Sequence, residues 1–202
     1  MLNLPIKNLG VLPYSDTLEN MLHHIQTGKA CELWLLEHPP VYTKGKRSLP
    51  EHFRHTNNIP VIPTDRGGQV TYHGPGQLVI YPLLKLASWG LSPIQLVDLL
   101  EMSTVQALAK LGITSNGNSE ARGVYIAQQK VGSIGLKIKS GYAYHGMAIN
   151  INMDLTPFDA IVPCGDAQMQ MTTIKQHTTE HQLFKTIWLD IFLANLFAKR
   201  YN

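Results

Sequence analysis

One cysteine of this sequence stands where a reactive side chain would be displayed. Cys164 lies in "IVPCGD" (161–166), between a proline and a glycine, which are residues typical of turns. A structural cysteine usually belongs to a periodic apolar segment, as Cys31 does by alternating with Leu33 and Leu35. Cys164 is therefore a nucleophile, a metal ligand, or a residue of the turn without a chemical role.

A cysteine attacks efficiently only as a thiolate, so it needs a neighbour that favours this form. Lys130 and His73 are both candidates, and sequence spacing does not choose between them. Lys130 begins the strand-like stretch 129–141. Strict alternation places it on the apolar, interior face, unless Gly132 or Gly135 introduces a bulge. The alternative is a lysine at a strand end whose ammonium group reaches solvent.

The same alternation assigns other charged residues of this region. Lys137 and Lys139 fall on the solvent face of the predicted strand. In the next stretch, 141–153, His145 shares a face with apolar residues such as Met147. A histidine in such a place is most often a hydrogen-bonded residue of the core, which is the interpretation favoured here.

The pattern of cysteines and histidines does not indicate a metal site. Neither C-x-x-C nor H-E-x-x-H occurs. The neighbouring histidines His23 and His24, and the pair His52 and His55, are expected at the surface. We therefore expect no metal ion.

Glycines are concentrated in "DRGGQVTYHGPGQLVIY" (65–81), which is the most unusual segment of the chain. Glycine allows the backbone to approach a ligand closely and to adopt a positive φ. The segment contains neither G-x-x-x-x-G-K-[ST] nor G-x-G-x-x-G, so it is not a known type of phosphate loop. Two tight turns around a short strand would explain the composition equally well.

Composition limits the classes of protein to consider. The 202 residues are 44% hydrophobic and 15% charged, which is enough for one folded domain spanning 1–202. The net charge of +3, without a run of lysine or arginine, does not indicate nucleic acid. We find no signal peptide and no apolar stretch long enough to cross a membrane. Two distant cysteines do not form a disulfide framework, so a reducing cytoplasm is expected.

The elements expected to position these residues are a mixture of strands and helices. Ser15 or Asp16 is expected to cap a first helix that ends at Gly28, and Ser92 a second helix. Thr179 and Gln182 have the spacing of a capping box before a C-terminal helix. Strands are expected at 30–38, 60–65, 76–84 and, with turns, over 123–153. This order favours an α+β fold with mixed sheets and flanking helices.

Helical spacing also predicts which apolar residues face the core. In the second helix these are Ile94, Val97, Leu100, Val105, Leu108 and Leu111. In the C-terminal helix they are Leu183, Ile187, Ile191 and Phe192.

Four linked motifs resemble the lipoyl(octanoyl) transferases. The first is "RGGQVTYHGPGQLVIY", with its Arg-Gly-Gly start, Thr-aromatic-His centre and later Gln and Tyr. The others, in matching order and spacing, are "EHPPVYTKG", "KVGSIGLKIKSGYAYHGMAININMDL" and "IVPCG". Together they cover most of residues 37–174.

The resemblance implies a fold, an activity and a site. The fold is that of the biotin and lipoate protein ligases, and the activity is transfer of an octanoyl group from acyl carrier protein to a lysine. The acceptors are the lipoyl domains of 2-oxoacid dehydrogenases and the glycine cleavage H protein. The resemblance makes Cys164 the nucleophile and Lys130 its partner. It assigns substrate binding to Arg66, Gly67, Gly68, Gln69, Val70, Thr71, Tyr72, His73, Ser133, Ile134, Gly135, Gly146, Met147 and Ala148.

The chemistry implied is an acyl transfer that proceeds through a thioester on the enzyme. A thioester donor and an amide product need neither ATP nor another cofactor. The main alternative is an ATP-dependent lipoate or biotin ligase with the same fold, which would need no cysteine. A module that binds a carrier domain without catalysis is a second alternative.

Overall fold

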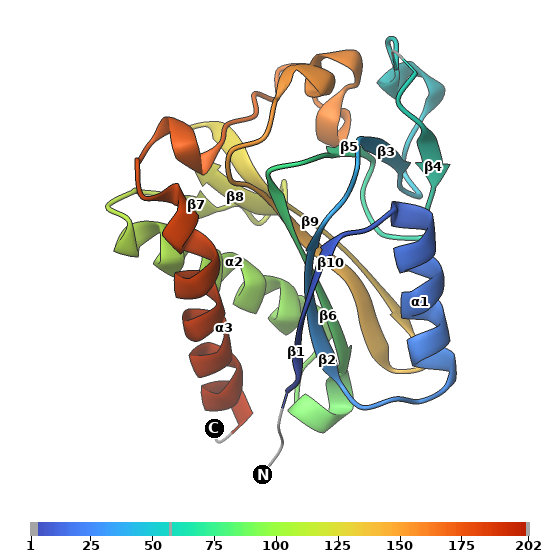
Figure 1. The fold of residues 1–202 in the computed structure, drawn as a ribbon, viewed down its shortest axis with the longest axis vertical. Coiled ribbons are helices and arrows are strands. Elements are labelled where there is room, and N and C mark those ends of the chain that lie inside the picture. The colour runs from blue at the N-terminus through green and yellow to red at the C-terminus, as the bar shows by residue number, and fades with distance from the viewer. Residues whose placement is uncertain (1–3, 57, 201–202) are drawn as a thin grey trace.

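The computed structural model describes residues 4–56 and 58–200, and its largest element is a seven-stranded mixed sheet (Figure 1). Its strands, in spatial order, are β1 (Ile6–Val11), β2 (Glu32–Glu37), β6 (Gln77–Lys85), β10 (Tyr142–Asn150), β9 (Gln129–Lys139), β8 (Gly123–Ile126) and β7 (Asn116–Gly117). The β1–β2 pair is parallel, and the other pairs are antiparallel.

A smaller sheet holds the glycine-rich segment against the large one. Its spatial order is β4 (Val61–Pro63), β3 (Val41–Lys44) and β5 (Val70–His73). The β3–β4 pair is parallel and the β3–β5 pair antiparallel. Between β4 and β5, the N–H of Gly67 donates to the carbonyl of Leu136 on β9, at 3.1 Å. This hydrogen bond fixes the glycine segment above the large sheet.

The helices cover both faces of the large sheet. Helices α2 (Pro93–Lys110) and α3 (Phe184–Arg200) lie together on one face, and α1 (Tyr14–Gln26) lies on the other (Figure 1). The mixed strand order with flanking helices confirms the predicted α+β class.

The start of α2 agrees with its sequence signals, whereas the start of α1 does not. Ser92 Oγ accepts from the N–H of Gln95, whose side-chain oxygen accepts from the N–H of Ser92, so the expected capping box forms. Helix α1 instead begins at Tyr14, with Pro13 as the N-cap residue. Pro13 offers no side-chain cap, and the hydroxyl of Thr17 donates to its carbonyl in the first turn.

The predicted apolar faces of the later helices are partly wrong. Ile94 on α2 is 52% exposed, and Leu183, which precedes α3, is 46% exposed. Thr179 and Gln182 form no capping box, because a short 3₁₀ turn (His181–Leu183) precedes α3. The buried face of α3 is Phe184, Trp188, Phe192 and Leu196, which recur every four residues.

The structure also corrects the expected exposure of two histidines. His24 and His52 are buried, not at the surface. A ring nitrogen of His24 lies 2.8 Å from the carbonyl oxygen of Ala30, and Nδ1 of His52 accepts from the N–H of Leu49. Local hydrogen bonds thus hold both rings inside. Within residues 4–56 and 58–200, none of the helices combines the length and apolar character that crossing a bilayer requires.

Trp188 links α2 to α3, and its removal should destabilise the protein. It is fully buried, stacks on Phe192 and donates from Nε1 to Thr104 Oγ1 at 2.9 Å. We expect Trp188→Ala to lower the free energy of unfolding by about 3–5 kcal/mol. Leu183→Ala should lower it by less than about 0.5 kcal/mol. Urea denaturation of both variants tests the buried face of α3, and equal losses would contradict it.

Candidate active site

Lys130 is buried, as predicted, but on the face of the sheet opposite to the predicted one. It is 2% exposed and pairs with Tyr125 of β8, whereas Gly132 pairs with Val124. Val131 is therefore an extra residue in β9, and its side chain packs into the core beneath α2 and α3. This bulge turns Lys130 to the opposite face of the sheet. The prediction from strict alternation is therefore wrong about the face and right about burial.

A glycine makes room for the lysine side chain. Gly123 has φ of +146°, and a Cβ there would lie 2.5 Å from Lys130 Cε and 3.1 Å from Nζ. The N–H of Gly123 donates to Glu101 Oε1 at 2.7 Å, which fixes this part of β8 on α2. The Tyr125 ring lies 5.4 Å from the ammonium group, within the range of a cation–π contact.

Cys164 meets this ammonium group from a strained turn. Lys130 Nζ donates to Cys164 Sγ at 3.1 Å. Cys164 is the central residue of a short 3₁₀ turn (Pro163–Gly165) and has φ of +57°, a left-handed conformation that is unusual for a residue with a side chain. His73, the other candidate partner, bonds instead to Gln77 Oε1 at 2.7 Å. The structure thus pairs the thiol with Lys130.

Backbone hydrogen bonds hold the two partners in register. The N–H of Lys130 donates to the carbonyl of Gln170, and its carbonyl accepts from the N–H of Thr172. The chain that leaves the Cys164 turn is thereby attached to β9 at the residue that carries the lysine. Asn150 on β10 donates to the carbonyl of Thr172 at 3.1 Å and anchors the same segment.

The charges of this pair support each other. Burial by itself lowers the pKa of Lys130, but the neighbouring Cys164 and Tyr125 groups outweigh it, and the net effect is a raised pKa. Lys130 is therefore protonated at neutral pH. An ammonium group at 3.1 Å favours the thiolate over the thiol. The ammonium group therefore lies where it would stabilise negative charge on the Cys164 sulfur during a reaction.

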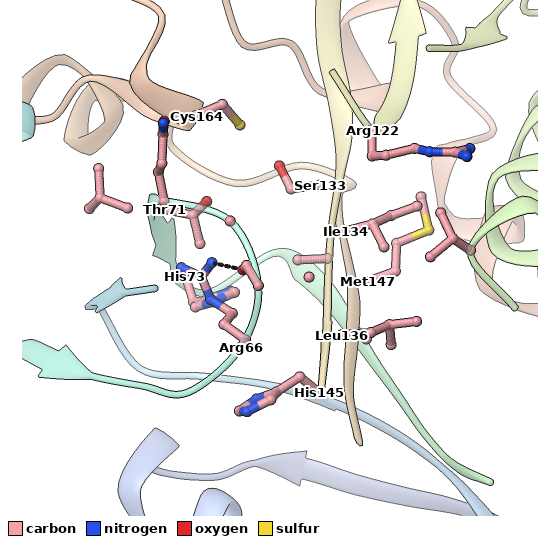
Figure 2. A pocket seen from close by; sticks show the side chains of 18 of the residues that line it. Arg66, Thr71, His73, Arg122, Ser133, Ile134, Leu136, His145, Met147 and Cys164 are labelled. Atoms are coloured by element: carbon pink, nitrogen blue, oxygen red, sulfur yellow. Dashed lines mark hydrogen bonds between the residues drawn. The ribbon is translucent and has the colours of Figure 1, made fainter. Parts of the chain in front are cut away.

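A cavity of about 370 Å³ opens beside the pair, within the usual size range of small-molecule sites. Figure 2 shows Cys164 near one end and His145 near the other, with Thr71, Ser133 and Arg66 between them. The segments singled out from the sequence line it: Arg66, Gly67, Gly68, Gln69, Val70, Thr71, His73, Ser133, Ile134, Gly135, Gly146, Met147 and Ala148. Tyr72 lies outside the lining and packs against Tyr42 and Phe158.

Paired glycines leave the floor of the cavity bare. Gly135 and Gly146 are direct partners in the β9–β10 ladder. A Cβ at Gly146 would lie 2.0 Å from the carbonyl oxygen of Ile80, and one at Gly135 would lie 3.0 Å from the carbonyl oxygen of Gly67. Gly146 therefore requires glycine, and a side chain at Gly135 would be a tight fit against the neighbouring backbone.

The end of the cavity away from Cys164 is polar, with a buried His145 and an Asp65 side chain that is 41% exposed. Arg66 is 8% exposed and donates to the carbonyl and hydroxyl of Thr43 and to the carbonyl of Gly67. The carboxylate of Asp65 accepts from the Tyr144 hydroxyl and lies 2.8 Å from Nε2 of His145.

Several of these residues were not identified from the sequence as parts of a site. Tyr14, at the start of α1, lines the cavity although its segment carries no motif. His145 was assigned to the core, and it does form the hydrogen bond expected of a core histidine, but it also faces the cavity. Tyr125 carried no local signal, because only the bulge in β9 places Lys130 against it. In the part of the chain that the structure describes, no group of three His, Cys, Asp or Glu side chains is arranged to hold a metal ion.

Comparisons with known proteins agree with this fold and site. Residues 16–193 match the family model of the lipoyl protein ligase A/B catalytic domain. The chain is 45% identical over 179 residues to an octanoyltransferase of Nitrosomonas europaea, covering 87% of each chain. It is 46% identical over 181 residues to one of Legionella pneumophila, covering 88% of this chain and 91% of the relative. The chain therefore belongs to the lipoyl protein ligase A/B catalytic-domain family, and within it to the octanoyltransferases, which are acyltransferases.

Solved structures show the same fold at much lower identity. A lipoate-protein ligase A bound with ATP aligns with a TM-score of 0.76 at 13% identity, covering 96% of this chain and 86% of that one. A biotin protein ligase from Aquifex aeolicus in complex with biotin and ATP aligns with a TM-score of 0.64 at 17% identity, covering 98% and 72%. The expected ligase-like fold is confirmed.

The lysine should control the reactivity of the thiol. In a Cys31→Ala background, Cys164 is the only cysteine left. We expect Lys130→Met to slow alkylation of Cys164 by iodoacetamide at pH 7 by at least about tenfold, because the ammonium group no longer favours the thiolate. The modification rate is followed by intact mass.

Lys137→Met is the matched control, since Lys137 lies on β9 outside this contact. It should leave the alkylation rate within about twofold of the parent. Equal slowing by both substitutions, in variants with native circular dichroism, would contradict the role given to the Lys130 contact.

The buried histidines should make the protein less stable in acid. Burial lowers the pKa of His38 and of His145 to about 4. The unfolded chain, with histidine near 6.5, binds more protons below that pH, so stability is full above pH 6.5 and falls as pH drops toward 4. Each histidine should remove roughly 2 kcal/mol from the free energy of unfolding by pH 5. Urea denaturation between pH 7 and pH 4.5 measures the slope.

His38→Gln should reduce the pH dependence of the free energy of unfolding by the contribution of one buried histidine. His55→Gln, at an exposed position, is the control. An unchanged slope in folded His38→Gln would show that the buried ring does not resist protonation.

Proposed function

We propose that this protein transfers an octanoyl group from octanoyl-acyl carrier protein to the target lysine of lipoyl carrier domains, through a thioester on Cys164. The observation that carries the proposal is the 3.1 Å contact between Lys130 Nζ and Cys164 Sγ beside a cavity of about 370 Å³. The names of the relatives support the octanoyl group as cargo. The whole chain, 1–202, is proposed as a single catalytic domain that acts in the cytoplasm.

In the first step, the Cys164 thiolate attacks the carbonyl carbon of the donor thioester. The new carbon–sulfur bond forms, the old one breaks, and the carrier thiolate leaves, taking a proton from the Lys130 ammonium or from solvent. One thioester replaces another, so the step is nearly neutral in free energy. The acyl chain then occupies the cavity.

Acylation changes the state of Lys130. The thiolate that held the pKa of Lys130 up is now an uncharged thioester, while burial, which lowers the pKa of this lysine, remains. The lysine therefore loses its proton more readily after the first step than before it. A neutral Lys130 is the base that the second step requires.

In the second step, the carrier lysine arrives as an ammonium ion and transfers a proton to Lys130. Its free amine attacks the thioester, the nitrogen loses its second proton to solvent as the amide bond forms, and Cys164 leaves as the thiolate. The cycle then ends with the Lys130 ammonium group beside the released thiolate. The amide is more stable than the thioester, so the sequence needs no ATP and no cofactor.

The structure does not favour the turn itself as the oxyanion site. The N–H of Gly165 donates to the carbonyl of Val162, and that of Asp166 to the carbonyl of Pro163. These two backbone N–H groups are therefore already used. The Lys130 ammonium, with protons beyond the one given to Sγ, is a donor for the developing negative charge.

An acyl-enzyme should accumulate when the acceptor is absent. We expect incubation with octanoyl thioester of acyl carrier protein to add one octanoyl mass, removable by hydroxylamine and located by peptide mapping on Cys164. Adding an apo lipoyl domain should discharge it onto a carrier lysine without ATP. Lys130→Met should slow both loading and discharge by at least about a hundredfold, the usual contribution of a proton-transfer residue.

Cys31→Ala is the matched control and should load normally, because Cys31 packs on the core. Carrier acylation without any adduct on Cys164, even under rapid quench, would instead support direct transfer. Transfer that requires ATP would support the ligase alternative. Binding of the lipoyl domain without acyl transfer would indicate a non-catalytic module.

A further inference from the structure

His145 adopts a conformation that an ordinary strand residue avoids. It lies within β10 and has φ of +56°. The ladder between β10 and β6 pairs Ala143 with Leu84 and resumes only where Met147 pairs with Ile80. A left-handed residue in a strand is strained and is kept only where its surroundings favour it.

The contacts of the ring show what the strained backbone achieves. Nε2 lies 2.8 Å from Asp65 Oδ1, the ring stacks on Tyr144, and the hydroxyl of Tyr14 lies 3.4 Å from Nδ1. Regular alternation would instead place His145 with Met147 on the face beneath α2. The ring therefore stands on the Arg66 side of β9 and β10, with Ile134 and Met147 on the other side (Figure 2).

The pairing of strands gives the distance between this ring and the reacting thiol. Lys130 Nζ lies about 3 Å from where Gly123 would carry a Cβ, and Gly123 pairs with Ser133. The Lys130–Cys164 pair is therefore level with the Ser133–Ala148 pair of the β9–β10 ladder. His145 belongs to the rung that it forms with Leu136, three residues further along.

Three residues of β-strand span roughly 10 Å, at about 3.4 Å per residue. An extended chain of eight carbons spans roughly 9 Å from its carbonyl carbon to its methyl carbon, with bonds of about 1.5 Å. A straight eight-carbon acyl group on Cys164 would therefore place its methyl group against the ring of His145. The floor between the two rungs is the bare pair Gly135 and Gly146.

We propose that His145 is the specificity-determining residue that closes the acyl end of the cavity and limits the straight chain to about eight carbons. The assignment rests on the proposed function and adds to it the residue that limits the length of the acyl chain.

The fixed surroundings of the ring explain why it would not yield to a longer chain. Asp65 holds one edge of it, and Asp65 is held in turn by the Tyr144 hydroxyl. Arg66, committed to acceptors on Thr43 and Gly67, lies beside it. Each added methylene would have to displace the buried, hydrogen-bonded ring of His145, and one methylene in a fitted pocket changes selectivity by about 10- to 200-fold.

His145→Gly is the sharpest test, since glycine accepts the left-handed backbone and removes only the side chain. We expect wild-type protein to load hexanoyl and octanoyl groups from their thioesters onto Cys164 and to discriminate strongly against decanoyl and dodecanoyl groups. In His145→Gly, decanoyl loading relative to octanoyl loading should rise by at least about tenfold. The readout is intact mass after rapid quench at each chain length.

His145→Asn gives a second, smaller change, because asparagine also tolerates this backbone and leaves a shorter polar group. It should shift the profile in the same direction by less. It also keeps the test valid if His145→Gly does not fold, as judged by circular dichroism.

Leu136→Ala tests the opposite face of the same rung, since Leu136 packs on the core under α2. An unchanged profile in folded His145 variants that still load octanoyl groups would overturn the assignment and leave the proposed function standing. A longer preferred chain in Leu136→Ala alone would place the acyl group on the other face and also overturn it. Failure of the wild-type protein to load any acyl group would instead refute the proposed function.

Discussion

The contact between a buried ammonium group and a thiol is the interaction on which the site depends. Lys130 is 2% exposed, and an unpaired ammonium group at that depth would be strongly destabilising. The contact of its Nζ with Cys164 Sγ and with the Tyr125 ring offsets this cost, and the neighbouring Cys164 and Tyr125 groups raise the pKa of the lysine. The fold therefore has to bring together two segments that are distant in sequence.

Three local features meet this requirement. The bulge at Val131 turns Lys130 toward the cavity, and Gly123 leaves space for its side chain. The chain beyond Cys164 is bonded to both backbone groups of Lys130, at Gln170 and Thr172. The pairing also explains why one lysine could serve two steps with opposite needs. In the proposed mechanism, acylation of Cys164 leaves the burial of Lys130 unchanged, so the same lysine acts first as a proton donor and then as a proton acceptor.

Local signals in the sequence predicted part of the local structure. The capping box at Ser92 and the turn around Cys164 were expected correctly, whereas the cap at Ser15 or Asp16 and the box at Thr179 do not form. The predicted face of Lys130 is wrong because the bulge arises from pairing with β8, and the predicted face of α3 is only partly right because packing against α2 decides it. The orientation of His145 toward the cavity depends on its contact with Asp65, eighty residues away.

The same fold occurs in structures of ligases bound with ATP, so the difference in chemistry has to be found in the site. A ligase has to cradle phosphates, for which free backbone N–H groups and cationic side chains are suited. Here the N–H of Gly67 is bonded to the carbonyl of Leu136, and the Arg66 guanidinium is committed to Thr43 and Gly67. The donors of Arg66 and Gly67 are thus bonded within the protein, and these residues form part of the cavity wall. A donor that arrives as a thioester is already activated, and what it requires from the enzyme is a nucleophile, a proton carrier and a cavity for the chain.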